Sequence, residues 1–116
     1  MEKYFEELPC AITVSDVDGN ILDMNVKAGS LYEKRGGREA LIGKNLLDCH
    51  PEPARTKLIN LLEQHNVNAY TIEKEGQKKL IYQTPWFENG EFKGYIELSL
   101  VIPFEMPHYI RKPKVQ

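Results

Sequence analysis

The stretch 12–32, ITVSDVDGNILDMNVKAGSLY, contains the strongest structural signals of the chain. Residues 12–15 alternate apolar and polar side chains, which is typical of a β-strand with one buried face. Asp18-Gly19 supplies a tight turn, and residues 21–24 are apolar enough for a second strand. The stretch therefore predicts a β-hairpin.

Helical signals follow this hairpin. Asn25 is suited to cap a helix through its side-chain oxygen, and Gly36-Gly37 is suited to end it. Short helical turns interrupted by Gly43 come next. Two prolines in DCHPEP, residues 48–53, disfavour helical backbone before Pro53. A longer helix is predicted to begin there, because apolar residues then recur at helical spacing on one face.

Three further strands are predicted in the last part of the chain, with Asn89-Gly90 as the turn between the final two. In the final strand, Ile96 and Leu98 belong to one apolar face, and Tyr95 and Val101 to the opposite, outward face. Strands at both ends of the chain around a helical middle predict an α+β fold. We expect a five-stranded antiparallel sheet with short helices and one longer helix packed on one face.

Composition and charge exclude several classes of function. The 116 residues are 41% hydrophobic and 28% charged, with a formal net charge of −2. No basic surface is expected, so nucleic acid is not expected as a partner. No apolar run approaches the roughly 18–20 residues of a membrane span, and the acidic N-terminus does not resemble a secretory signal. We expect a cytoplasmic protein with no membrane partner.

No enzymatic activity is predicted. The chain lacks a Ser-His-Asp set, an HExxH motif, a glycine-rich phosphate loop and a carboxylate cluster suited to acid–base catalysis. His65 and His108 have no metal-ligand spacing to each other or to the two cysteines. We therefore assign no catalytic residue.

The chain resembles a PAS domain. The resemblance rests on the stretch 12–32, on LIGKN at 41–45, and on the closing hairpin GQKKLIYQTPWFENGEFKGYIELSLVI at 76–102. It implies a sensory or interaction module that binds a small ligand or cofactor between sheet and helices, and that often dimerises. It divides the chain into an N-terminal cap or dimerisation segment (1–8), a PAS domain (9–103) and a C-terminal tail (104–116). An effector protein or domain is expected outside this chain.

DCHPE at 48–52 resembles the CHPP element of a PAS subgroup that includes haem sensors. The resemblance implies His50 as a candidate axial haem ligand, with Met24 as an available thioether. Non-covalent flavin near Trp86 is the weaker alternative. A covalent flavin adduct is not expected, because Leu46 stands where the reactive cysteine would be, and Cys49 comes three residues later. Two roles for His50 therefore remain open at this point: a haem ligand and a structural residue.

A pocket between sheet and helices is expected to be lined by eight residues: Ile12, Val14, Leu46, Leu58, Leu61, Tyr82, Ile96 and Leu98. The expected function is to bind a small ligand there and to relay binding by a conformational or dimer change. The alternative is a ligand-free module for homodimerisation, in which the N-terminal segment packs on the sheet of a second copy.

Overall fold

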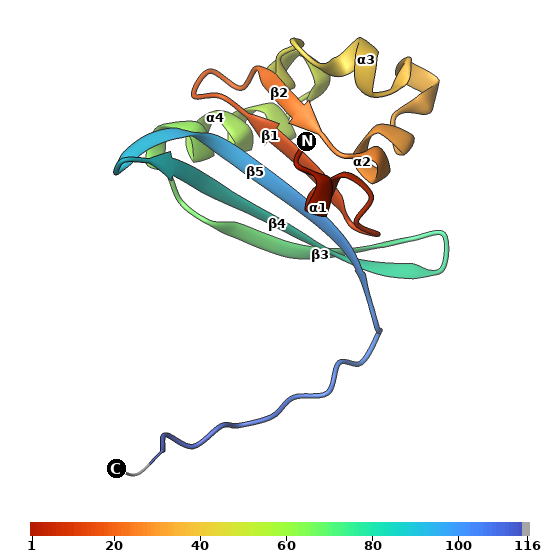
Figure 1. Ribbon diagram of the computed structural model, residues 1–116, viewed down its shortest axis with the longest axis vertical. Helices are drawn as coiled ribbons and strands as arrows, with labels where there is room; N and C mark the ends of the chain where they lie inside the picture. The colour runs from red at the N-terminus through yellow and green to blue at the C-terminus, as the bar shows by residue number, and fades with distance from the viewer. Residues whose placement is uncertain (115–116) are drawn as a thin grey trace.

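A five-stranded antiparallel sheet supports all other elements of this computed structural model, which describes residues 1–114 (Figure 1). The strands run in the order β2-β1-β5-β4-β3, so the first and last strands of the chain meet in the centre of the sheet. Their bounds are β1 Ala11–Ser15, β2 Ile21–Met24, β3 Asn68–Lys74, β4 Gln77–Glu88 and β5 Glu91–Ile102. The predicted α+β fold is confirmed.

The helical elements lie mostly between β2 and β3. In chain order they are α2 Val26–Ser30, the 3-10 turn η1 Glu33–Arg35, α3 Gly37–Leu41, the 3-10 turn η2 Leu46–Cys49 and α4 Ala54–Gln64, while α1 Lys3–Glu6 precedes the sheet. The helix predicted after Asn25 is shorter than expected and ends at Ser30. α4 begins immediately after Pro53, as predicted, and His50 is extended as its following proline requires.

The strand register defines two faces of the sheet. Thr13, Glu97 and Gln83 lie opposite one another on β1, β5 and β4, on the face toward α2–α4, here called the inner face. The neighbouring position on each strand points to the opposite side of the sheet. Ile12, Leu98 and Tyr82 therefore form a row on the other face, here called the outer face. The inner row is polar where it meets the helices, and the outer row is apolar.

Gly94 allows β1 and β5 to approach closely at one end of their ladder. A Cβ atom at this position would lie 1.9 Å from the carbonyl oxygen of Ser15, and the backbone φ is +146°. The indole Nε1 of Trp86, opposite Gly94 on β4, donates a hydrogen bond of 2.9 Å to the same carbonyl. The glycine therefore lets Trp86 connect β4 to β1 across β5.

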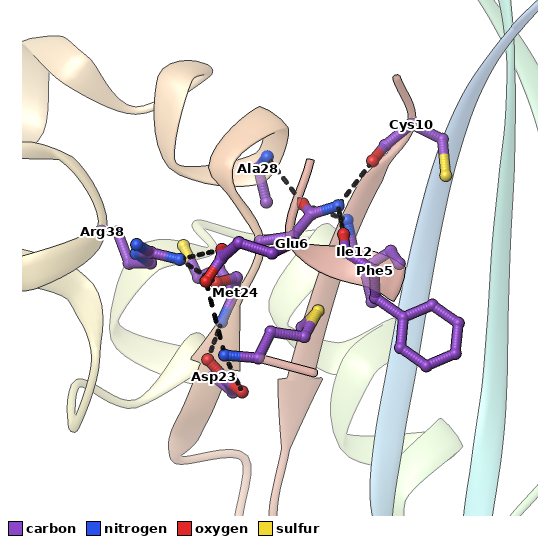
Figure 2. A network of polar contacts seen from close by, with 10 residues as sticks. Phe5, Glu6, Cys10, Ile12, Asp23, Met24, Ala28 and Arg38 are labelled. Carbon is purple, nitrogen blue, oxygen red and sulfur yellow. Dashed lines mark hydrogen bonds and ion pairs between the residues drawn. The ribbon is translucent and has the colours of Figure 1, made fainter. Parts of the chain in front are cut away.

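Asn25 holds α1, β1 and α2 together through hydrogen bonds to four residues that Figure 2 labels: Phe5, Cys10, Ile12 and Ala28. Its side chain is completely buried. The Oδ1 atom accepts hydrogen bonds of 3.0 Å from the backbone N–H groups of Ile12 and Ala28. The Nδ2 atom donates to the backbone oxygens of Phe5 (2.9 Å) and Cys10 (2.8 Å). One amide thus caps α2, as predicted, and also fixes the N-terminal segment.

The chain leaves the sheet after β5. Residues 103–114 form no regular helix or strand and extend away from the domain in Figure 1. Residues 104–114 of this segment belong to the predicted tail 104–116, of which 115–116 lie outside the described residues. Within residues 1–114, none of the helices has the length and apolar character needed to cross a lipid bilayer.

Candidate ligand cavity

A cavity of about 150 Å³ lies between the inner face and the helical segment. Its apolar wall comes from β2, α3, η2 and α4 and consists of Ile21, Met24, Leu41, Leu46, Leu58 and Leu61. Ile96 borders it from β5, and its polar wall consists of Thr13, Ser15, Tyr32, Arg35, Cys49, His50, Gln83, Tyr95 and Glu97. The space is closed mainly by apolar side chains over a polar sheet surface, as in many small-molecule sites.

A hydrogen-bonded polar row crosses the sheet beneath this cavity. Asn68 on β3 donates from Nδ2 to Oε1 of Gln83 (2.9 Å), and Gln83 donates from Nε2 to Oε1 of Glu97 (2.7 Å). Thr13 on β1 lies opposite Glu97. Each hydrogen bond of the row is donated in the direction of the Glu97 carboxylate. The side-chain amide of Gln83 therefore has a defined orientation, in which its oxygen accepts from Asn68 and its N–H donates to Glu97.

His50 has a defined tautomer when it is neutral. Its Nδ1 lies 2.6 Å from the backbone oxygen of Leu46, which can only accept, so Nδ1 carries the proton and donates. The Nε2 atom of the neutral ring is then unprotonated and can accept a hydrogen bond or bind a metal. η2 and the extended backbone at His50 place the residue in the cavity wall.

Tyr32 contributes a hydroxyl above the polar row. Burial raises the pKa of Tyr32 above its ordinary value, and the negative charge of Glu97 raises it further, against a smaller lowering by Arg35. The phenol is therefore protonated at neutral pH. It can donate or accept a hydrogen bond at the cavity wall.

Tyr95 is positioned by helix α4 and the loop after it. Its hydroxyl lies 2.6 Å from the backbone oxygen of Leu61 and 2.7 Å from that of Asn66, so it donates to these carbonyls. Burial raises the pKa of Tyr95, although the bond to Asn66 opposes this. Tyr95 is only 5% exposed, so the predicted outward position of this side chain is wrong.

Haem does not fit this arrangement. His50 has the hydrogen-bonded Nδ1 typical of metal-binding imidazoles, and Met24 also lines the cavity. A space of about 150 Å³ accommodates a ring of benzene size. Both a tetrapyrrole and the three-ring system of a flavin are larger than the space that this cavity offers.

Half of the eight predicted pocket residues line the cavity, namely Leu46, Leu58, Leu61 and Ile96. The other four, Ile12, Val14, Tyr82 and Leu98, do not line it, and the register places them on the outer face. The prediction chose the wrong sheet face because it took the apolar strand positions as the inner ones. Trp86, the predicted flavin contact, is not among the residues that line the cavity, and its indole donates to Ser15.

Sequence reasoning missed the polar residues of the inner face. Thr13, Gln83 and Glu97 alternate with the apolar residues that it selected, so the strand period identifies them once the inward face is known. Tyr32 was noted only as an aromatic near a helix end. No local signal distinguishes a cavity-lining tyrosine from one in the core.

A second hollow of about 210 Å³ adjoins the cavity on the inner face. The two share Thr13, Tyr32 and Glu97, which therefore lie between them. Lys74 and Lys79 are found in the second hollow and not among the residues that line the cavity. The cavity itself has Arg35 as its basic side chain, on the exposed side of η1.

No protein-family model matches this sequence, and no curated protein sequence does. Solved structures are similar in fold. A sensory box sensor histidine kinase from Vibrio cholerae has a TM-score of 0.64 at 14% identity, over 89% of this chain and 89% of that chain. The PAS domain of an HTR-like protein from Haloarcula marismortui has a TM-score of 0.55 at 19% identity, over 84% and 85%. This chain has the PAS fold.

A third PAS-fold structure is relevant to the haem hypothesis. The Aer2 receptor from Vibrio cholerae, described as a dual PAS-heme oxygen sensor, has a TM-score of 0.56 at 20% identity, over 81% of this chain and 95% of that chain. Haem is a property of that protein. At such identity the likeness shows a shared fold, and the residues of this chain decide what enters its cavity.

Proposed function

We propose that this chain is a non-enzymatic sensory domain that binds a small organic molecule between α4 and the inner face of the sheet. The observation that carries the proposal is the cavity of about 150 Å³, with apolar walls from the helices and a polar row beneath. The sensor kinase and receptor whose structures share the PAS fold support a signalling role by analogy. The cytoplasmic location expected from the sequence is part of the same proposal.

A chain of contacts connects the cavity wall to the N-terminal helix. The side chain of Met24 lines the cavity, and its backbone oxygen accepts a hydrogen bond of 3.0 Å from Arg38 (Figure 2). The same guanidinium pairs with Glu6 of α1. Ligand binding that shifts β2 or α3 would therefore alter the position of α1, and we propose this as the route by which binding is relayed.

The ligand proposal is tested by native mass spectrometry after incubation with a small-molecule extract of cells. The Leu61→Phe variant fills part of the cavity, and Leu100→Phe makes the same change on the outer face. We expect a bound mass on wild type and on Leu100→Phe that is lost from Leu61→Phe. A mass retained equally by Leu61→Phe, or no bound mass on any of the three proteins, would overturn the proposal.

Homodimerisation is the second candidate function, and the outer face favours it. Tyr4 and Phe5 of α1 are 72% and 46% exposed, and Tyr82 of the outer row is 36% exposed. Figures 1 and 2 place α1 beside β1 and β5. A second copy that packs on these residues would bury apolar surface that one copy leaves in water.

Solution mass, with and without residues 1–8, tests the dimer. We expect a dimer for the full chain and a monomer for the shortened chain, because α1 supplies part of the proposed contact surface. A full chain that remains monomeric at high concentration would overturn this candidate function and leave the ligand proposal unaffected.

A further inference from the structure

The cavity has the size of a single aromatic ring. An engineered protein cavity of about 150 Å³ with apolar walls binds benzene, and this cavity has the same volume. Its apolar wall encloses one end of the space, through Ile21, Leu58 and Leu61 among others. A ligand held here would bury one ring against these side chains.

Glu97 is the last acceptor of the polar row and is partly exposed. Its Oε1 atom accepts from Gln83, and among residues 1–114 no hydrogen bond is donated to its Oε2 atom. In the same part of the chain Glu97 forms no ion pair, although Lys79 lies in the adjoining hollow. A carboxylate oxygen only accepts, so this end of the cavity is complementary to a hydrogen-bond donor.

His50 makes a second acceptor. Because its Nδ1 donates to Leu46, the Nε2 atom of the neutral ring accepts. Thr13 and Tyr32 have hydroxyls that adapt to either role. The fixed polar groups therefore both require donors from the ligand.

Charge further restricts the ligand. An anionic ligand would be repelled by the Glu97 carboxylate at the polar end. The permanently cationic side chain of the cavity lining, Arg35, belongs to the exposed turn η1. A neutral or cationic nitrogen compound is attracted to Glu97, and pairing with its carboxylate gives a charge-assisted hydrogen bond.

We propose that the cavity takes a single-ring amino-substituted nitrogen heterocycle or arylamine, with its N–H groups donated to Glu97 and its ring among the apolar residues of α4 and β2. This inference rests on the proposed function and names the chemical class of its ligand. Glu97 is the residue that selects this class against aromatic acids and against unsubstituted hydrocarbons of the same size.

Calorimetric titration with three one-ring probes tests the class: 2-aminopyridine, toluene and benzoate. On wild type we expect 2-aminopyridine to bind at least about tenfold more tightly than toluene, because its amino group can donate a charge-assisted hydrogen bond to Glu97. Benzoate is expected to bind more weakly than toluene. This ranking needs no variant, so it cannot be lost to misfolding.

Variants then locate the interaction. Glu97→Gln removes the charge and keeps an acceptor for Gln83. It is expected to weaken the binding of 2-aminopyridine by about tenfold or more. Glu73→Gln makes the same charge change on β3, where Glu73 is exposed opposite Lys78, and should leave the affinity unchanged. Equal affinity of wild type and Glu97→Gln for 2-aminopyridine would overturn the proposal.

Two outcomes separate this inference from the proposed function. If benzoate or toluene binds best and Leu61→Phe abolishes that binding, the cavity is a ligand site and the inferred class is wrong. If no one-ring probe binds wild type, the class is also wrong. The extract experiment with Leu61→Phe then decides separately whether the cavity binds a molecule of another kind.

Discussion

The two faces of the central sheet have opposite chemistry at neighbouring positions. On β5, Glu97 belongs to the inner row with Gln83 and lines the cavity, whereas Leu98 belongs to the outer row with Tyr82. In most small domains the apolar strand positions face the helices and the polar ones face water. Here the polar positions face the helices, which is the arrangement of a ligand site.

The inner face is suited to binding and the outer face to packing. Ile12 on the outer face is only 8% exposed, and α1, whose Tyr4 and Phe5 are exposed, lies beside β1 and β5 in Figure 1. Polar residues such as Glu97 on an inner surface contribute less to folding than apolar residues of the same size would. The proposed ligand would account for their position.

The largest expected effect comes from a change that disrupts both faces together. Gly94→Ala places a methyl group against the Ser15 carbonyl, 1.9 Å from its oxygen, at a φ of +146° that L-residues rarely adopt. We expect a loss of about 4 kcal/mol or more in the free energy of unfolding, measured by urea denaturation.

Gly76→Ala is the matched control for this substitution. Gly76 also has a positive φ, +76°, but nothing lies within 4 Å of an added Cβ. This variant should be destabilised only by the left-handed backbone conformation of its new alanine, which costs about 1–2 kcal/mol in the free energy of unfolding. Equal destabilisation by the two variants would show that the approach of β1 and β5 at Gly94 is not as close as described.

Asn25→Ala is expected to have the next largest effect, because it removes the hydrogen bonds that connect the N-terminal segment, β1 and α2. Truncation leaves two buried N–H groups and two backbone oxygens without the partner they have in Asn25. At about 1–3 kcal/mol for each unsatisfied buried group, partly relieved by water, the expected loss is about 3–5 kcal/mol by denaturant unfolding.

Asn25→Asp distinguishes the two halves of this network. It keeps the acceptor for Ile12 and Ala28 and loses the donor to Phe5 and Cys10. We expect intermediate stability, with faster hydrogen exchange confined to residues 1–10. Global exchange with no preference for that segment would contradict the role of Asn25 in holding α1.

The same substitution on adjacent residues of β5 compares the two faces directly. Leu98→Gln should lower the free energy of unfolding by about 1–2 kcal/mol, since it puts an amide on the apolar outer face. Glu97→Gln should change it by less than about 1 kcal/mol, because the charge at the inner face does not stabilise folding. Thermal unfolding of both variants checks this, and the reverse order of stability would contradict the assigned faces.

A smaller effect is expected on the titration of Tyr32. Burial, and then the Glu97 charge, raises the pKa of this phenol. Because the folded state retains the proton more strongly than the unfolded chain, the stability contribution of Tyr32 is complete below about pH 10 and is lost as the pH rises through its raised pKa. Glu97→Gln should lower that pKa.

Ultraviolet titration can measure this shift, with Tyr32→Phe identifying the signal of Tyr32. Tyr70 should respond in the same direction, since its pKa is also raised, first by burial and then by Glu97. Glu73→Gln is the control with the same charge change. No difference between wild type and Glu97→Gln would indicate that the Glu97 carboxylate is not close to the Tyr32 phenol.

Local signals were enough to predict the fold from the sequence. The Asp18-Gly19 and Asn89-Gly90 turns fix two hairpins, and the Asn25 cap and Pro53 each fix the start of a helix. Each of these signals depends on a few neighbouring residues. The α+β fold follows from their order along the chain.

The orientation of the sheet could not be predicted in the same way. Alternation at residues 95–102 defines two faces but does not say which one the helices cover, because that depends on contacts between distant segments. The apolar outer row was the natural choice for the inner one. Leu58 and Leu61 of α4 were found because an amphipathic helix has a single apolar face.

The most direct test of the inner face as the binding surface is an NMR measurement of intermolecular NOEs between 2-aminopyridine and methyl-labelled wild-type protein. We predict NOEs from the ring protons to methyl groups of Ile21, Leu58 and Leu61, which line the cavity. NOEs to Ile12, Leu98 and Leu100 instead would place binding on the outer face and would contradict the assignment.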